Sequence, residues 1–241
     1  MSSRVHVGQA ALIGKIERYA RVFDFLEVRA SPAPPSPSRM RRLRGEAPEG
    51  FCFSLVAPQK LVELSASEPD AALVEATRAA ANALGARWLA LRTPAAVAPS
   101  ARARARLARL VELLRGAATG IAWEPRGVWT DEDAERAAAE LDVVLVRDLA
   151  EYEPPPGPVI YTRLWALGRN SRIGAGIIER VAERIEDADE AFVIAEGRGA
   201  VGLAKQLRQI EASDVPNDDE DDEGEEDEDF AEEDDELDED E

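Results

Sequence analysis

Short apolar runs recur along the first 210 residues of this chain, and polar or periodically apolar stretches separate them. Apolar runs bounded by glycine, proline or charged residues are typical of strands buried on both faces. They predict eight strands, at Arg4–Gly8, Phe25–Ala30, Phe51–Ala57, Arg87–Arg92, Gly120–Glu124, Asp142–Arg147, Val159–Leu164 and Ala191–Ala195.

Most of the segments between these runs carry helix signals. Apolar residues at helical spacing, N-capping residues and closing glycines predict helices at Ala11–Val22, Arg39–Arg44, Ser67–Gly85, Ser100–Arg115, Thr130–Leu141, Arg172–Ile185 and Gly199–Ile210. Ser67 and Ser100 are predicted to be N-caps, and Thr130 forms a capping box with Asp133. The proline-rich segments Ser31–Ser38 and Asp148–Pro158 are predicted to be loops, because proline lacks the backbone donor that helices and sheets require.

Strands that alternate with helices over about 210 residues are typical of a closed (β/α)₈ barrel. The fold class that we predict is therefore α/β, with one TIM-like barrel. A doubly wound open sheet is the alternative, because the same alternation of elements also produces that fold.

The acidity of the chain is concentrated at its C-terminal end. Residues 211–241 contain 22 acidic and no basic residues, which leaves 27 acidic and 29 basic residues in residues 1–210. Such a segment has too few large apolar side chains to offset the entropy cost of folding, and its like charges repel. We predict a barrel domain over residues 1–210 and a disordered acidic tail over residues 211–241, which could attract a basic protein partner.

Few residues offer metal or nucleophile chemistry. Cys52 lies in a predicted strand, where packing is the expected role of the thiol, and a lone cysteine fits a reducing compartment. His6, the one histidine, lies in the first strand, away from any predicted cysteine or histidine partner. We expect no metal and no cofactor. No apolar run approaches the roughly 18 residues of a membrane span, and no signal peptide pattern opens the sequence, so we expect a cytoplasmic protein.

The candidate chemistry lies at the carboxyl ends of the strands, where barrel enzymes place their active sites. Side chains two positions apart on a strand point to the same face. Three strands end in such polar sets: Glu27 with Arg29, Glu124 with Arg126, and Tyr161 with Arg163 and Trp165. Trp129 follows the second set. We expect these eight residues to share one mouth.

Arginine recurs at this mouth, and its planar fork binds phosphate or carboxylate groups with two hydrogen bonds. We expect an anionic ligand between Arg126 and Arg163, with Glu124 and Tyr161 as proton-transfer groups and Glu27, Arg29, Trp129 and Trp165 as further ligand contacts. The alternative is that the arginines and carboxylates only neutralise each other where the barrel core meets water. The basic runs Arg39–Arg44 and Ala101–Arg106 fit solvated helix surfaces better than a nucleic-acid site.

Several of these motifs together resemble one family. Glu27-Val28, the strand with Phe51, Phe53 and Ser54, the set Glu124, Arg126 and Trp129, and the pair Tyr161 and Arg163 follow in the order of the YecE-like family, domain of unknown function 72. The resemblance covers about residues 4–210 and implies a TIM-like barrel without an established activity.

The sequence also departs from that family's pattern. Arg29 replaces an asparagine, and the family's lysine falls near Val56. Its two histidines fall at Gly127 and Trp165, and its final asparagines fall near Glu196 and Gly197. These departures argue against an activity that depends on the missing side chains. Two hypotheses follow: a barrel enzyme, weakened or inactive, that acts on an anionic small molecule, and a non-catalytic binding module that uses the barrel and the tail.

Overall fold

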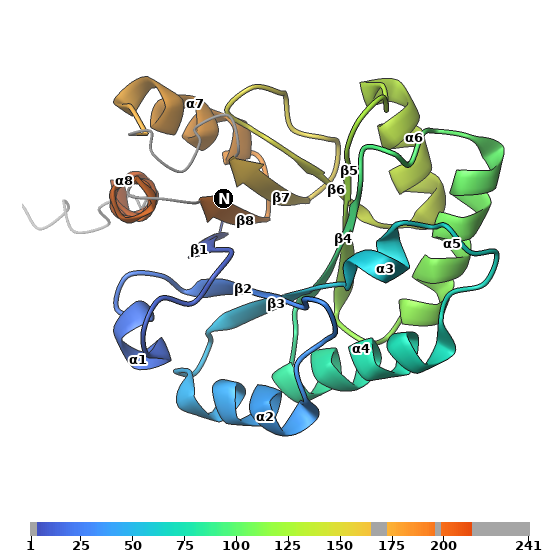
Figure 1. The fold of residues 1–241 in the computed structure, drawn as a ribbon. Coiled ribbons are helices and arrows are strands. Elements are labelled where there is room, and N and C mark those ends of the chain that lie inside the picture. The colour runs from blue at the N-terminus through green and yellow to red at the C-terminus, as the bar shows by residue number, and fades with distance from the viewer. Residues whose placement is uncertain (1–3, 165–172, 196–198, 214–241) are drawn as a thin grey trace, which may run out of the picture.

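Eight parallel strands close into a barrel in the computed structural model, which describes residues 4–164, 173–195 and 199–213 (Figure 1). Each strand pairs with the next one along the chain, and β8 returns to pair with β1. The strands are β1 (Arg4–Gln9), β2 (Phe25–Arg29), β3 (Cys52–Val56), β4 (Trp88–Thr93), β5 (Gly120–Pro125), β6 (Val144–Arg147), β7 (Val159–Leu164) and β8 (Glu190–Ala195). The predicted barrel is confirmed, and the predicted strands agree with these bounds to within two residues at each end.

The helices form a ring outside the strands, in chain order around the barrel (Figure 1). They are α1 (Ile16–Tyr19), α2 (Pro37–Glu46), α3 (Gln59–Val62), α4 (Ala71–Leu84), α5 (Ala101–Leu114), α6 (Asp131–Leu141), α7 (Ala175–Ile185) and α8 (Ala200–Ser213). None of the helices in the described part of the chain is long and apolar enough to cross a membrane.

One helix prediction at the start of the chain was wrong. The predicted helix Ala11–Val22 is reduced to the single turn α1, because Gly14 adopts a left-handed backbone (φ 82°) that an α-helix cannot continue through. The short helix α3 lies in a segment for which the sequence predicted no element. The basic helix α2 begins after Ser36, with Pro37 in its first turn.

Side-chain caps fix where most of the longer helices begin. Ser100 accepts from the Ala103 amide at 3.1 Å and Thr130 accepts from the Asp133 amide at 3.2 Å, as predicted. Gly85 ends α4 in the left-handed conformation, also as predicted. Ser67 was the wrong cap for α4, because the helix begins three residues later, where the Asp70 carboxylate accepts from the amides of Ala72 and Leu73.

The barrel interior consists of two polar layers separated by an aromatic layer. The aromatic layer contains Phe25, Trp88, Tyr161 and Phe192, whose neighbouring ring centroids lie 5.2–6.2 Å apart. Gly120 makes room for it, because a Cβ atom there would lie 2.2 Å from the Trp88 ring. Buried polar residues lie on both sides of the layer: Glu27, Glu124 and Arg163 toward the carboxyl ends of the strands, and His6 toward their amino ends.

The last described helix, α8, packs against β1 and extends to Ser213, beyond the domain end that we expected at residue 210. Residues 214–241, which make up most of the predicted acidic tail, lie outside the described residues.

Candidate functional site

A cluster of charged side chains fills the carboxyl end of the barrel. Strand alternation points Glu27, Arg92, Glu124 and Arg163 from β2, β4, β5 and β7 into the interior, just above the aromatic layer. Arg126 follows Glu124 by two residues and lies on the same side. We call these five residues, together with Tyr161, the mouth cluster. The polar sets predicted at the ends of β2, β5 and β7 thus contribute to one site.

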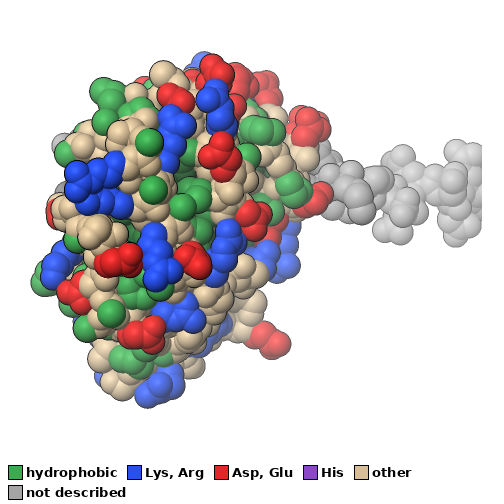
Figure 2. Space-filling view, turned by 90° about the vertical axis from the view of Figure 1, so that its right-hand side faces the viewer, with side chains coloured by type: hydrophobic (Ala, Val, Ile, Leu, Met, Phe, Trp, Pro, Cys, Tyr) green, Lys and Arg blue, Asp and Glu red, His purple; other side chains and the backbone are tan. Residues whose placement is uncertain are grey.

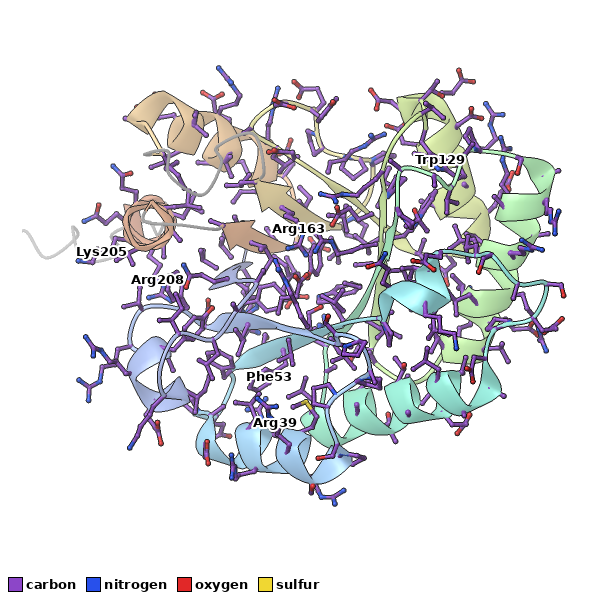
Figure 3. The ribbon with its side chains drawn as sticks, viewed as in Figure 1. Arg39, Phe53, Trp129, Arg163, Lys205 and Arg208 are labelled. Atoms are coloured by element: carbon purple, nitrogen blue, oxygen red, sulfur yellow. The ribbon has the colours of Figure 1, made fainter. Side chains whose placement is uncertain are left out.

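Arg163 is the centre of the mouth cluster, and Figure 3 shows it in the middle of the ring of strands. Its Nε donates to Glu124 Oε2 at 3.0 Å, and its Nη2 donates to Glu27 Oε1. The Tyr161 hydroxyl donates to the same Glu27 oxygen at 2.9 Å. Arg163 therefore holds two carboxylates from opposite sides of the barrel, and its side chain is only 2% exposed.

Glu124 connects this buried centre to the surface. Its Oε2 accepts from Arg92 Nε at 2.9 Å as well as from Arg163, and its Oε1 lies 3.4 Å from Arg126 Nε. The exposed fraction of the arginine side chains rises outward, from 2% at Arg163 to 20% at Arg92 and 47% at Arg126. Arg92 and Arg126 are thus the members of the mouth cluster that solvent or a ligand reaches first.

Burial and charge shift the pKa values of these groups. Burial raises the pKa of Glu124, although the charges of Arg163 and Arg92 oppose the change. Burial raises the pKa of Tyr161 well above its ordinary value, and the negative charge of Glu27 adds to the effect. Burial alone would lower the pKa of Arg163, but Glu27 and Glu124 outweigh it, so its pKa is raised. Tyr161 consequently stays protonated and acts as a donor to Glu27.

One oxygen of each carboxylate accepts no hydrogen bond from the described residues. These buried atoms are Glu27 Oε2 and Glu124 Oε1, of which Glu124 Oε1 forms an ion pair with Arg126 at 3.4 Å. Buried carboxylate oxygens normally accept hydrogen bonds, and an unsatisfied one costs free energy. The mouth cluster therefore offers acceptors as well as cationic donors.

Trp129 lies apart from the mouth cluster. Its ring packs edge-on against Trp123, with centroids 4.9 Å apart, and its Nε1 donates to the Val97 carbonyl at 2.8 Å. Figure 3 shows Trp129 at the α6 side of the molecule, well away from Arg163. These contacts give Trp129 a packing role between the strands and helices, and we leave it out of the site.

Arg29 extends the site to one side. Its exposed side chain follows Glu27 at the end of β2 and lines a groove of about 560 Å³. Both basic and acidic side chains line this groove: Lys15, Arg39 and Arg42 with Glu17, Glu27 and Glu46. Trp165, the remaining predicted ligand contact, lies outside the described residues, as do Glu196 and Gly197.

Gly127 explains one of the departures noted in the sequence. Its backbone is left-handed (φ 87°), and a Cβ atom there would lie 2.6 Å from the Ala95 carbonyl oxygen. A histidine would be strained at this position of the chain. The mouth cluster therefore has no imidazole from the β5–α6 loop.

A second polar cluster, which the sequence reasoning missed, lies at the amino end of the barrel. The expectation that His6 is away from any cysteine was wrong, because Cys52 Sγ lies 4.0 Å from His6 Nε2. Asp24 Oδ2 lies 3.0 Å from His6 Nδ1. The positions of these residues in the sequence could have predicted the cluster, because His6, Asp24 and Cys52 all lie near the amino ends of neighbouring strands. Among the described residues, no three His, Cys, Asp or Glu side chains are arranged to hold a metal ion.

A cavity of about 620 Å³ also lies at the amino end of the barrel, beside β5, β6 and β7. Its charged lining residues, Arg115, Glu135 and Asp142, are exposed, and the Pro155–Pro158 segment forms part of its wall. Its volume makes this cavity one candidate for the functional site. The mouth cluster is the other candidate, because its charges are buried and interact with one another. We assign the candidate site to the mouth cluster because buried charges must have specific partners, and open space has no such requirement.

The arginines of α5 do not form a basic surface. Arg104 pairs with Asp133 at 3.1 Å and Arg109 pairs with Glu112 at 2.8 Å. Figure 2 shows the face over this helix, where Lys and Arg side chains alternate with Asp and Glu. An interspersed pattern of this kind is typical of a solvated helix surface.

Comparison with known proteins identifies relatives by sequence and by fold. The family described as "Protein of unknown function DUF72" matches residues 9–214. A DUF72 family protein from Thermotoga maritima has a similar structure, with a TM-score of 0.67 and 16% identity over 86% of this chain and 98% of that one. No curated protein matches the sequence.

Two further structures show how widely the fold is shared. A DUF72 family protein from Enterococcus faecalis has a TM-score of 0.67 and 14% identity, over 86% of this chain and 97% of that one. A D-allulose 3-epimerase from Methylomonas sp. has a TM-score of 0.54 and 15% identity, over 88% of this chain and 99% of that one. At such identities, these likenesses establish the barrel fold and nothing about the reaction.

Proposed function

This chain belongs to the DUF72 family, and from the chemistry of its mouth cluster we propose that it binds a small anionic molecule that carries a phosphate or carboxylate group. The accessible arginines of the mouth cluster carry this proposal. Among the described residues, three arginines, Arg92, Arg126 and Arg163, face two carboxylates, Glu27 and Glu124. Arginine keeps its charge at physiological pH, and the exposed parts of Arg126 and Arg92 offer charged N–H donors to an anion.

Exposure decides which arginines would contact the ligand. Arg126 and Arg92 are accessible, whereas Arg163 is buried with its guanidinium bonded to Glu27 and Glu124. We assign the anion to Arg126 and Arg92 and treat Arg163 as the residue that positions both carboxylates. The sequence suggested an anion between Arg126 and Arg163, whereas this proposal replaces the buried Arg163 by the more exposed Arg92. The exposed charge of Arg29 would draw the anion toward the same end of the barrel.

The buried carboxylate oxygens narrow the ligand class. Glu124 Oε1 is ion-paired with Arg126 but accepts no hydrogen bond from the described residues, so it would accept one from a hydroxyl group of a ligand whose anionic group binds Arg126. A hydroxy acid or a phosphorylated polyol has both features. Glu124 would also be the group that exchanges a proton with such a ligand, because burial raises its pKa and so makes the carboxylate easier to protonate. Tyr161 would take part only through Glu27, because its hydroxyl donates to that carboxylate.

The experiment compares Arg126→Leu with Arg136→Leu. The two arginine side chains are similarly exposed, at 47% and 50%, and Arg136 pairs with Glu132 on α6, outside the mouth cluster. Binding of inorganic phosphate and of glycerol 3-phosphate is measured by isothermal titration calorimetry. Charge-assisted hydrogen bonds contribute about 1.5 to 3 kcal/mol, so Arg126→Leu should weaken binding roughly 10- to 100-fold.

The control Arg136→Leu should bind both compounds as the unchanged protein does. Tighter binding of glycerol 3-phosphate than of phosphate would support the role of Glu124 as an acceptor. Absence of binding by the unchanged protein, or equal affinities of the two variants, would contradict the proposed site.

A further inference from the structure

The polar cluster at the amino end of the barrel has the components of a nucleophilic site. Cys52 Sγ contacts His6 Nε2 at 4.0 Å, and His6 Nδ1 contacts Asp24 Oδ2 at 3.0 Å. A nucleophile beside a base, with the base oriented by a third group, is the arrangement that activates thiols and hydroxyls. We call these three residues the thiol cluster. Phe25, Trp88 and Phe192 of the aromatic layer lie between it and the charged residues of the mouth cluster.

His6 is held in one orientation by its surroundings. Its ring stacks on Phe192, with centroids 4.9 Å apart and an interplanar angle of 17°. Asp24 is itself fixed, because its Oδ1 accepts from the Val7 amide at 2.9 Å. Glu190 Oε1 lies 3.3 Å from His6 Nε2, closer than the Cys52 sulfur at 4.0 Å. The imidazole therefore points Nδ1 at Asp24, and Nε2 faces both Glu190 and the thiol.

The neighbouring charges keep His6 protonated. Burial lowers the pKa of His6, but hydrogen bonds to Asp24 and Cys52 and the charges of these groups raise it to about 10. Arg87 pairs with Glu190 at 2.6 Å, and Arg208 of α8 lies 3.7 Å from Asp24. Among the described residues, the cluster thus has three cations, His6, Arg87 and Arg208, against the two carboxylates of Asp24 and Glu190.

Cys52 is also accessible, since its side chain is half-buried while His6 is buried. A thiol that served only for packing would not need contact with solvent or with a charged imidazole. Nothing in this arrangement belongs to the mouth cluster.

We propose that Cys52 is a nucleophilic thiol that reacts with small hydroperoxides, with His6 as its proton donor and acceptor and Asp24 as the residue that positions His6. The sulfur attacks the terminal peroxide oxygen, a sulfur–oxygen bond forms and the oxygen–oxygen bond breaks. The leaving oxygen takes the proton that His6 carries and departs as water or an alcohol. The thiol is oxidised to a sulfenic acid while the peroxide is reduced, and no further reactant is required.

The first test uses the full-length chain, in which Cys52 is the one cysteine, so that every thiol signal comes from this residue. The sulfenic acid formed with hydrogen peroxide is trapped with dimedone and counted by mass spectrometry. We expect the folded chain to react at pH 7 at least tenfold faster than the same chain unfolded in urea. A folded chain that reacts no faster than the unfolded one would overturn the proposal.

The second test separates the positioning role of Asp24 from a structural role. Asp24→Asn removes the carboxylate behind His6, and Asp189→Asn removes an exposed carboxylate near the same end of the barrel as a control. The groups that face His6 are Asp24, Cys52 and Glu190, with Arg87 and Arg208 behind them. We expect the rate of the unchanged protein to vary little between pH 6 and 8.

Asp24→Asn should lower the rate at pH 6 at least tenfold and make it rise with pH, as for a simple thiol, while Asp189→Asn should leave the profile unchanged. Melting temperatures establish that both variants are folded. Identical pH profiles of the two folded variants would overturn the role of Asp24. If Asp24→Asn does not fold, the pH profile of the unchanged protein decides: a flat profile supports the proposal, and a rate that rises tenfold per pH unit overturns it.

Discussion

Arg163 shows how one residue can organise a barrel interior. Its guanidinium bonds to carboxylates that come from strands on different sides of the barrel, at sequence separations of 136 and 39 residues. Burying charges is costly unless each has a partner, so the pairs Arg163–Glu27 and Arg163–Glu124 depend on one another. This mutual dependence gives Arg163 a structural role in addition to its position in the proposed site.

We predict that Arg163→Leu destabilises the protein by about 3 to 5 kcal/mol, because it leaves Glu27 and Glu124 buried without their central cation. The free energy of unfolding is measured by urea titration. Arg147→Leu is the control: Arg147 is also largely buried, at 13% exposed, but its partner Asp131 is 63% exposed and stays hydrated. Arg147→Leu should lower the free energy of unfolding by about 1 kcal/mol or less. If both substitutions lower the free energy of unfolding equally, the carboxylates of the mouth cluster do not depend on Arg163.

At the scale of elements, capping residues decide where helices begin. α4 offers a direct comparison, because the sequence suggested Ser67 as its N-cap and the structure has Asp70 there. Both residues precede the same apolar periodicity and both can accept from backbone amides. The difference lies in the segment between them, which does not continue the helix, so that only Asp70 stands beside the free amides of the first turn.

We predict that Asp70→Ala lowers the melting temperature at pH 7 and that Ser67→Ala leaves it unchanged. A hydrogen bond from Lys60 and those from the Leu73 and Ala72 amides lower the pKa of Asp70. The contribution of this carboxylate is therefore present above the pKa of an unfolded aspartate and is lost as the pH falls through the lower, folded value. The difference between the two variants should shrink at acidic pH, and a difference that is constant with pH would contradict the assignment.

At the scale of the whole molecule, the barrel provides two chemically separate ends. The aromatic layer of Phe25, Trp88, Tyr161 and Phe192 fills the interior between the charged residues of the mouth cluster and the thiol cluster, and Tyr161 is part of both the layer and the mouth cluster. Substitutions at one end should therefore leave the function of the other end unchanged. The surrounding helices complete the hydrophobic core. In the contacts described above for the mouth cluster and the thiol cluster, the one helix residue is Arg208, which lies near Asp24.

We predict that a chain truncated after Ser213 keeps the melting temperature of the full-length protein. The removed residues 214–241 carry many like charges and few large apolar side chains, so they have little to contribute to a packed core. Scanning calorimetry of both chains at the same protein concentration makes the comparison. A marked drop on truncation would show that the acidic segment packs against the barrel.

Sequence alone determined the elements and the direction in which most side chains point. Strand alternation has a period of two, so Glu27, Glu124 and Arg163 could be assigned to the interior without any coordinates. Local chemistry likewise predicted the caps Ser100 and Thr130. These features depend on residues within a few positions of each other, and that is why a single sequence reveals them.

Only the tertiary structure decided which of those side chains meet. Barrel closure and strand register placed Arg163 between two distant carboxylates, and they brought His6 to Cys52 across 46 residues of sequence. The same packing turned Trp129 toward Trp123 and away from the mouth cluster. Alternation assigns a residue to a face but not to a neighbour, because neighbours on a closed sheet depend on how every strand is aligned with the next.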